Sequence, residues 1–310
     1  MGAITAATFH VPVLGAAVAS TAAGCRRAVD GTVGGGGHAA LLLDQGAEVL
    51  AIDRDPDAIG AAQARLAGHR ARFVTGRFAD PAVLEMVRGF NPDFVLLDLG
   101  VSSHQLDTGE RGFSFRPGVP LDMRMTPVEA SVPPAAEVLN TSPEAELARL
   151  LRDGGDEPRA RRLARTIARR RRRRPFALSD DLVGAIREAL GPRTGPADFA
   201  RLFQAVRIEV NQERAELERA LPALLEALQP GGRFAVLSYH SGEDRVVKRS
   251  FAEWARACVC PPGLPVCACR GRPLGVLDPR RPVLPTPAEV VANPRARSAK
   301  LRGFRKAHAS

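Results

Sequence analysis

Long apolar runs, lysine and tryptophan are scarce in this 310-residue sequence. No apolar run reaches the roughly 18 residues that span a bilayer, so we expect no transmembrane helix and no membrane partner. The first 24 residues contain no lysine or arginine, so the basic start of a secretory signal is missing. We therefore expect a soluble, cytoplasmic protein, whose five cysteines are thiols rather than disulfides in that reducing compartment.

Positively charged residues outnumber negatively charged residues in the sequence, 44 to 34. The net charge is +10, and only three of the 44 basic residues are lysines. A GC-rich genome would also favour arginine over lysine, but it would not produce a surplus of positive over negative charge. Because arginine forks hold phosphates and a positive field steers polyanions, this surplus favours a polyanionic partner.

The first third of the chain alternates short apolar runs with helical patterns. Apolar runs occupy residues 28–30, 39–43, 48–53, 72–75 and 94–98, and helical patterns occupy 56–66 and 81–88. This alternation predicts parallel βαβ units in a doubly wound α/β sheet, with a nucleotide-type ligand at the carboxyl ends of the strands.

The alternation stops after residue 99 and resumes late in the chain. Residues 143–151, 159–174 and 178–190 read as helices, and in the second of them Ala160, Leu163, Ala164, Ile167 and Ala168 form one apolar stripe. A longer helix at 211–228 then precedes a strand at 233–238. The sequence therefore predicts one α/β domain, residues 1–103 and 207–310, interrupted by a helical insertion domain at 104–206 that recognises the substrate.

A glycine-rich loop follows the first predicted strand. Asp30 precedes a stretch that contains four consecutive glycines, and Asp53 ends the next strand about 20 residues on, where a carboxylate can accept both hydroxyls of a ribose. A dinucleotide site has the same layout, but the loop lacks a clean GxGxxG register. Because Asp30 would repel a pyrophosphate and attract a cation, S-adenosylmethionine is favoured over NAD.

Asp98 ends the fourth predicted strand, where the transferable methyl group of such a cofactor would point. Methyl transfer needs mainly alignment and an electrostatically matched pocket. If the acceptor is an amine, Asp98 can stabilise its developing positive charge or accept its proton. A helix cap is the structural alternative for this aspartate.

Several ordered motifs resemble a known family, the bacterial RsmH or MraW methyltransferases. The resemblance covers nearly the whole chain, from His10 to about Arg305. Its segments are residues 10–14, 30–38, 51–56, 98–103, 110–115, 121–125, 203–208, 210–211 and 293–302. It implies a Rossmann-like class I methyltransferase that modifies the exocyclic N4 of a cytosine in the decoding region of 16S ribosomal RNA, in the assembled or nearly assembled 30S subunit. The protein could form a homodimer, and the sequence leaves this question open.

The resemblance also implies a set of site residues. The cofactor-binding residues would be Gly36, Gly37, His38, Asp53, Phe78, Asp98 and Gln105, with Phe78 against the adenine. The first choice for the proton acceptor is Asp98, followed by His240 and Asp122. The chain departs from the family in having Tyr239 for phenylalanine and Gly242 for leucine, and the segment 195–204 is two residues longer.

Two basic stretches predict contacts with RNA phosphates, which position RNA without reading its sequence. One is the run of six arginines at 169–174, and the other comprises Arg295, Arg297, Lys300, Arg302, Arg305 and Lys306. The target cytosine must leave its stack to react. Candidates for lining its pocket are Arg111, Phe113, Phe115, Asp122 and Arg124.

Three questions stay open at the level of the sequence. Cys258, Cys260, Cys267 and Cys269 could hold a structural zinc ion, although zinc ligand pairs are more often spaced by two to four residues, or they could be plain thiols or a disulfide. The chain could be an RNA-binding assembly factor without turnover. The presence of Asp53, Asp98 and His240 argues against this alternative. It could also be an amino-methyltransferase of another nucleic acid, although residues 98–103 differ from the Asn-Pro-Pro-Tyr motif of common DNA enzymes.

Overall fold

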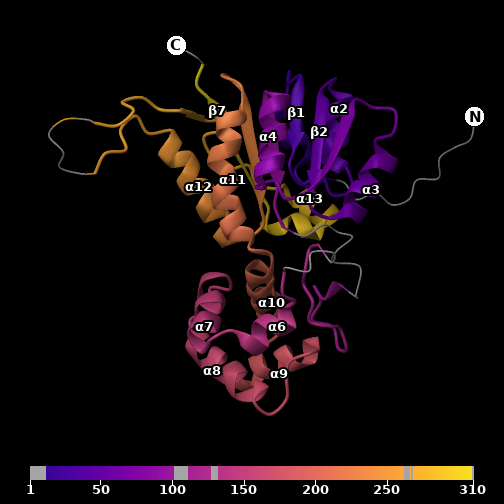
Figure 1. The fold of residues 1–310 in the computed structure, drawn as a ribbon, viewed down its shortest axis with the longest axis vertical. Helices are drawn as coiled ribbons and strands as arrows, with labels where there is room; N and C mark the ends of the chain where they lie inside the picture. Colours follow the sequence, from indigo (N-terminus) through magenta and orange to yellow (C-terminus); the bar gives the residue numbers. More distant parts are fainter. Residues whose placement is uncertain (1–11, 101–110, 127–131, 262–265, 267, 309–310) are drawn as a thin grey trace, which may run out of the picture. The chain divides into compact units, whose positions relative to one another are not determined.

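The computed structural model describes residues 12–100, 111–126, 132–261, 266 and 268–308 (Figure 1). The chain divides into two compact units. The first, which we call the sheet unit, comprises Met1–Gly100 and Glu216–Ser310, and the second, the helical unit, is Val101–Ala215. None of the helices in the described parts of the chain has the length and apolar character of a membrane span.

The sheet unit contains a seven-stranded sheet in the order β3-β2-β1-β4-β5-β7-β6. The strands β1 to β5 are parallel, and β7 runs antiparallel to both of its neighbours. The strand bounds are β1 Arg27–Asp30, β2 Glu48–Asp53, β3 Ala71–Thr75, β4 Phe94–Asp98, β5 Arg233–Ser238, β6 Gly275–Leu277 and β7 Lys300–Lys306.

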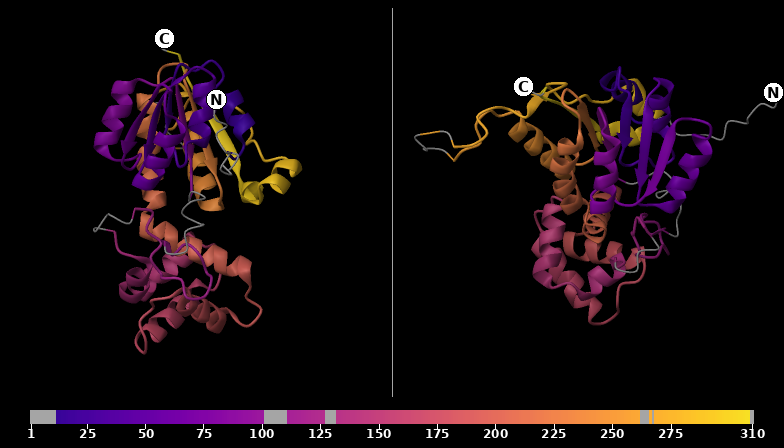
Figure 2. Two further views of the ribbon diagram at one scale, coloured as in Figure 1. Left: turned by 90° about the vertical axis from the view of Figure 1, so that its right-hand side faces the viewer. Right: turned by 45° about the horizontal axis from the view of Figure 1, so that its top comes forward.

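Helices cover both faces of this sheet (Figure 2). Alternate residues of β4 belong to different cores: Val95 and Leu97 pack with α4, α11 and α12, whereas Phe94 and Leu96 pack with α1, α2 and α3. The bounds are α1 Gly15–Thr21, α2 Gly37–Asp44, α3 Pro56–Arg65, α4 Pro81–Phe90, α11 Glu213–Ala227, α12 Ser241–Trp254, α13 Pro287–Ala292 and the 3₁₀ helix η2 Pro294–Ser298. The predicted doubly wound α/β fold is confirmed.

The apolar run at 39–43 lies in α2, the helix that the sequence predicts after the glycine-rich loop. The end of the chain differs from the prediction. The strands β6 and β7 were not predicted, because β7 carries four basic residues among its seven and so reads as a charged surface segment. Its buried residues Leu301 and Phe304 nevertheless belong to the cores of the sheet.

The helical unit packs five described helices around its own hydrophobic core. Their bounds are α6 Ala135–Thr141, α7 Glu144–Asp153, α8 Ala160–Arg171, α9 Ser179–Leu190 and α10 Pro196–Asn211. The predicted apolar stripe of α8 is buried along its length, whereas α6 and α10 were missed.

The predicted helix at 211–228 corresponds to α11, Glu213–Ala227, which begins two residues later than predicted. The helix α10 ends at Asn211, and Gln212 adopts a left-handed conformation with φ 54° before α11 begins. A non-glycine residue in this region is uncommon, so the break has no strong sequence signal. The boundary placed at residue 206 therefore falls inside α10, and the role of the helical unit in substrate recognition stays a prediction.

Candidate active site

Three aspartates end neighbouring parallel strands of the sheet unit. Asp30 ends β1, Asp53 ends β2 and Asp98 ends β4. In the strand register, Asp30 is paired with Ala51 of β2 and with Leu96 of β4. Since parallel strands bring their carboxyl ends to one edge of a sheet, the three carboxylates share the edge at which such folds bind ligands.

The glycine-rich loop between β1 and α2 is held by Asp53. The Asp53 carboxylate accepts hydrogen bonds from the backbone amides of Gly34 and Asp55, each at 2.9 Å. Gly36, just before α2, has φ 79°, which favours glycine. The first amides of α2 have no partner within the helix and so provide donors for a ligand. Burial raises the pKa of Asp53 despite its two hydrogen bonds.

Asp30 is a buried carboxyl group with an incomplete set of partners. Its side chain is 1% exposed, and Oδ1 accepts a hydrogen bond from the Thr32 amide at 3.2 Å. Oδ2 is buried without a hydrogen bond from the described residues. Burial raises the pKa of Asp30 to about 7, even though His38 and the Thr32 amide act in the opposite direction. A cation placed near Oδ2 would supply the missing partner.

Asp98 makes two hydrogen bonds and lies within ion-pair distance of a histidine. The Tyr239 hydroxyl donates a hydrogen bond to Oδ1 at 2.7 Å, and His38 Nε2 lies 3.3 Å from Oδ2. The Asp98 amide donates to the Thr32 hydroxyl oxygen at 2.6 Å. About a quarter of the Asp98 side chain, 24%, remains exposed. The carboxylate is therefore held in one orientation and still reachable.

Tyr239 is the site residue that the sequence reasoning missed. The sequence marks it only as a replacement for phenylalanine, but its hydroxyl contacts Asp98. Burial, together with the Asp98 carboxylate, raises the pKa of Tyr239 far above its ordinary value, so the hydroxyl stays protonated and donates. A signal was available, because Tyr239 directly follows β5, the neighbour of β4 in the sheet.

His38 lies on α2 and is buried. Burial alone would lower the pKa of His38, but the carboxylates of Asp98 and Asp30 outweigh this effect and the pKa is raised. The structure thus brings together three of the predicted groups, namely Asp30 of the loop motif, His38 and Asp98.

His240 and Asp122, the second and third choices for the proton acceptor, have other contacts. His240 caps α12: its Nδ1 accepts from the Gly242 and Glu243 amides at 3.1 and 3.3 Å, and Nε2 lies 3.1 Å from Glu243 Oε1. Asp122 belongs to the helical unit and makes two hydrogen bonds, of 2.9 and 2.8 Å, with the guanidinium of Arg124. Burial alone would raise the pKa of Asp122, but Arg124 outweighs it and lowers the pKa.

Of the two remaining predicted cofactor contacts, Phe78 and Gln105, the structure describes only Phe78. Phe78 is 8% exposed and packs in the core of the sheet, so its contact with an adenine stays a prediction. A Cβ added to Gly31 would lie 3.5 Å from the Phe78 Cβ, which places Phe78 beside the start of the glycine-rich loop. Gln105 lies outside the described residues.

The residues predicted to line a cytosine pocket make contacts within the helical unit. The ring of Phe115 packs against Phe199 and Phe203, with centroids 5.9 and 6.1 Å apart, and Phe113 also packs against this core. Arg111 donates to a backbone carbonyl oxygen, that of residue 125, at 2.8 Å. A role of these side chains toward RNA stays a prediction.

The six consecutive arginines divide into two groups of three. Arg169 and Arg170 pair with Glu188, and Arg171 donates to two carbonyl oxygens near the end of α6 at 2.7 and 2.9 Å. The side chains at 172–174 are exposed and make no ion pair or hydrogen bond with any residue that the structure describes. These last three arginines are therefore available to phosphates.

Several side chains of the second basic stretch make ion pairs and hydrogen bonds within the sheet unit. Arg302 and Lys300 pair with Asp244 of α12, at 2.7 and 3.2 Å. Lys306 donates to three carbonyl oxygens at the end of α11, at 2.6 to 2.9 Å, and burial lowers its pKa. These three side chains stabilise β7 against its neighbours, a role that their charge alone did not reveal.

Comparison with known proteins covers nearly the whole chain. The profile of the MraW methylase family matches residues 7–307. The chain is 54% identical over 305 residues to the ribosomal RNA small subunit methyltransferase H of Gemmatimonas aurantiaca, covering 97% of this chain and 96% of that protein. It is 48% identical over 288 residues to the protein of the same name from Heliobacterium modesticaldum, covering 90% and 91%.

Among solved structures, an rRNA methylase from Streptococcus thermophilus matches with a TM-score of 0.40 and 12% identity, covering 95% of this chain and 94% of that one. A likeness at this level adds nothing to the strand order described above.

Proposed function

The chain belongs to the MraW methylase family, and on that premise we propose that it transfers a methyl group from S-adenosylmethionine to the exocyclic N4 of a cytosine in the decoding region of small-subunit ribosomal RNA. The observation that carries the proposal is the oriented, partly exposed carboxylate of Asp98 at the end of β4. The printed names of the relatives support RNA of the small ribosomal subunit as the substrate.

The cofactor site that we propose lies along the edge formed by β1, β2 and β4. S-adenosylmethionine supplies an electrophilic methyl group on a sulfonium when bound. Asp53 would accept the ribose hydroxyls, and Phe78 and Gln105 would contribute contacts. Gly37 would offer its backbone amide, whereas Gly36, whose own amide donates to the Val33 carbonyl oxygen at 2.8 Å, would allow the backbone to approach the ligand closely. The fit is supported by Asp30, whose buried Oδ2 has no hydrogen bond from the described residues and whose charge suits a cationic ligand.

Asp98 has the central chemical role in this proposal. An amine nitrogen that accepts a methyl group from a sulfonium gains positive charge as the methyl–sulfur bond breaks and a neutral thioether leaves, and the nitrogen then loses one proton. The Asp98 carboxylate would orient the amine by accepting its N–H, stabilise the developing charge and accept the proton. Tyr239 would keep this carboxylate in place through its hydrogen bond to Oδ1, and His38, whose Nε2 lies 3.3 Å from Oδ2, would add an electrostatic contact. Such fixed charge in a shielded site needs no reorganisation during the reaction.

The RNA would be positioned by the exposed arginines at 172–174, together with other surfaces of the two units. Phosphate contacts of this kind fix the RNA without reading its sequence. We propose the assembled or nearly assembled small subunit as the substrate.

Transfer of labelled methyl groups tests the proposal. The purified chain is incubated with methyl-labelled S-adenosylmethionine and small subunits that lack the modification, in parallel with naked RNA, and mass spectrometry of the digested RNA locates the label. We expect N4-methylcytosine at one position. Binding of cofactor and subunit without any transfer would instead indicate an assembly factor, and label on another atom would contradict the cytosine N4 assignment.

Replacing Asp98 tests its role separately. We expect Asp98→Ala to lower turnover at least about 100-fold, the lower range for a general base, while cofactor binding is largely kept. Asp44→Asn, at the exposed end of α2, is the matched control and should keep full activity. Full activity of Asp98→Ala would refute its role without affecting the family assignment.

A further inference from the structure

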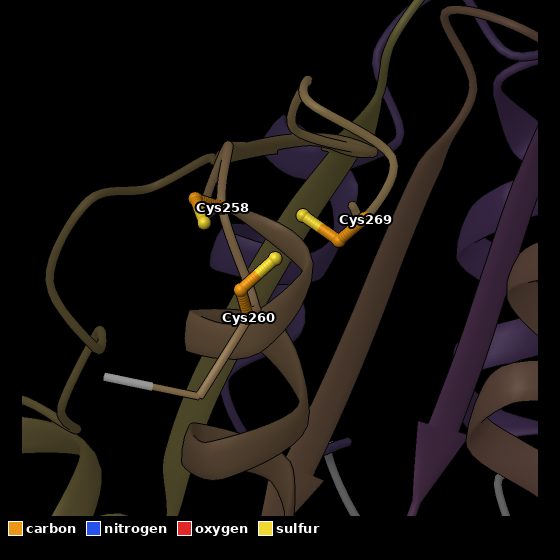
Figure 3. Close-up of side chains that lie close together, drawn as sticks. All are labelled: Cys258, Cys260 and Cys269. Carbon is orange, nitrogen blue, oxygen red and sulfur yellow. The ribbon is translucent and has the colours of Figure 1, made fainter. Parts of the chain in front are cut away.

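Three cysteines of the sheet unit lie together in a segment that the proposed reaction does not use. We call residues 255–274, between α12 and β6, the cysteine loop; residues 255–261, 266 and 268–274 of it are described. Cys258 and Cys260 lie on the limb that leaves α12, and Cys269 lies on the limb that returns to β6 (Figure 3). Their Sγ atoms all lie within 4.8 Å of one another.

This spacing suits one metal ion shared by three sulfurs. Sulfurs bound to a tetrahedral zinc ion are about 3.8 Å apart, because the Zn–S bond is about 2.3 Å long. A disulfide joins only two sulfurs, at about 2 Å, and leaves a third thiol unexplained. The cysteines come from two limbs that are distant along the loop, so the arrangement closes the loop at its base.

A backbone amide already points at one of the sulfurs. The amide of Val259, between Cys258 and Cys260, donates a hydrogen bond to Cys269 Sγ at 3.3 Å. Cys269 Sγ also lies 4.0 Å from the Ala257 carbonyl oxygen, on the same limb, and hydrogen bonds from the surroundings of a metal site orient its ligands. These contacts tie the two limbs together and orient Cys269 toward the other two cysteines.

The base of the cysteine loop is held by the rest of the sheet unit. Arg270 donates to the carbonyl oxygens of Glu253, Arg256 and Arg272, at 2.5, 3.0 and 3.1 Å. The Leu274 amide donates to the Trp254 carbonyl oxygen at 2.8 Å. The indole of Trp254 packs against three phenylalanine rings, those of residues 234, 251 and 304. The two limbs are thus brought together without any ion, which lowers the entropy lost when a metal binds.

The charge of the loop also suits a metal–thiolate group. Three thiolates and one Zn²⁺ carry a net charge of −1, and the loop contains the three arginines at 256, 270 and 272. The fifth cysteine provides a contrast. Burial, together with Asp93, raises the pKa of Cys25 to about 11, so this thiol stays protonated.

We propose that Cys258, Cys260 and Cys269 bind one Zn²⁺ ion through three thiolates, and that this ion fixes the two limbs of the cysteine loop to each other. Zinc is the expected metal because thiolate ligands select it among the common divalent cations. The site is independent of methyl transfer, since none of its ligands lies among the residues assigned to the reaction. Cys267, the remaining cysteine of the loop, lies outside the described residues and is not part of the proposed ligand set.

Metal analysis of the full chain tests the proposal. Protein purified under reducing conditions without chelators should contain about one zinc per chain by mass spectrometry. The triple variant Cys258→Ser, Cys260→Ser, Cys269→Ser should contain none, whereas the matched control Cys25→Ser should contain as much as the wild type. A triple variant that still holds stoichiometric zinc would overturn the assignment of ligands.

Cobalt titration keeps the test independent of whether the triple variant folds. Wild-type chain stripped of metal should develop the intense visible bands of tetrahedral Co²⁺ with thiolate ligands, saturating at about one ion per chain, and Zn²⁺ should abolish these bands. Absence of zinc in the purified protein together with absence of these bands would refute the site.

Discussion

Replacing Asp30 with asparagine would test whether the buried end of β1 bears an unfavourable charge when no ligand is bound. Burial raises the pKa of this carboxyl group from 3.8 to about 7. Because the folded-state pKa is raised, stability is fully present below the unfolded-state pKa and is lost as the pH rises toward the folded-state pKa. Asparagine keeps the size of the side chain and does not ionise, so its contribution should not depend on pH.

The magnitude follows from the pKa shift. Each unit is worth about 1.36 kcal/mol, so the whole shift corresponds to about 4 kcal/mol of unfolding free energy. Between about pH 5.5 and about pH 8, only the part up to the folded-state pKa is titrated, so the wild-type chain should lose about 2 kcal/mol through Asp30. We expect Asp30→Asn to become more stable relative to the wild type by this amount across the same range.

Urea unfolding at the two pH values measures this difference. Trp254 is the only tryptophan, is 6% exposed and lies in the sheet unit, so its fluorescence reports on the unit that contains Asp30. Asp44→Asn is the matched control and should titrate like the wild type. If the gap between wild type and Asp30→Asn were the same at both pH values, the pKa of Asp30 would not be raised into this range, and the reasoning that its burial is uncompensated without a ligand would be refuted.

Four further predictions concern the ligand, the RNA and the helical unit. Binding of S-adenosylmethionine near pH 6.5 should release a proton from the wild type but not from Asp30→Asn, which calorimetry in buffers of different ionisation enthalpy detects; equal values would argue against contact with the cation. Asp53→Asn should weaken cofactor binding by calorimetry about 10- to 100-fold, because a hydrogen bond to a charged acceptor is worth about 1.5–3 kcal/mol, and an unchanged affinity would remove Asp53 from the ribose site. Glutamine at all three positions 172–174 should reduce the slope of log affinity for RNA against log salt by about 2, whereas an unchanged slope would make these arginines a solvated surface. Gly112→Ala should destabilise the helical unit by at least about 1 kcal/mol in urea unfolding followed by circular dichroism, because φ is 79° and the added Cβ would lie 2.6 Å from two backbone atoms; wild-type stability would contradict this geometry.

The sequence predicted best where a strand is apolar along its length and ends in a charged residue. The strands β1, β2 and β4 have this pattern, so the pattern alone places their ends at Asp30, Asp53 and Asp98 along one edge of a sheet. The strand β7 could not be recognised, because its arginines and lysines pair with residues that are distant in the chain.

The same limit applies to side chains at the candidate site. A sequence shows that Tyr239 and His240 follow a strand, but not that the first contacts Asp98 while the second caps α12. Nor does a run of arginines show which of its side chains have acceptors. Arg169 and Arg170 pair with Glu188 of α9, and Arg171 donates to carbonyl oxygens near the end of α6. Such partners are selected by tertiary packing, which local patterns do not record.

The position of β7 has a consequence for how the protein is made. This strand lies between β5 and β6 in the sheet but comes last in the chain, and the sheet unit is assembled from residues on both sides of the helical unit. During synthesis, residues 101–215 emerge as one uninterrupted segment with a core of their own and can fold early. The sheet cannot close until residues 300–306 have left the ribosome, so until then β6 lacks the only strand that it pairs with in the described structure. A chain cut short before residue 300 would leave both β5 and β6 with an unpaired edge.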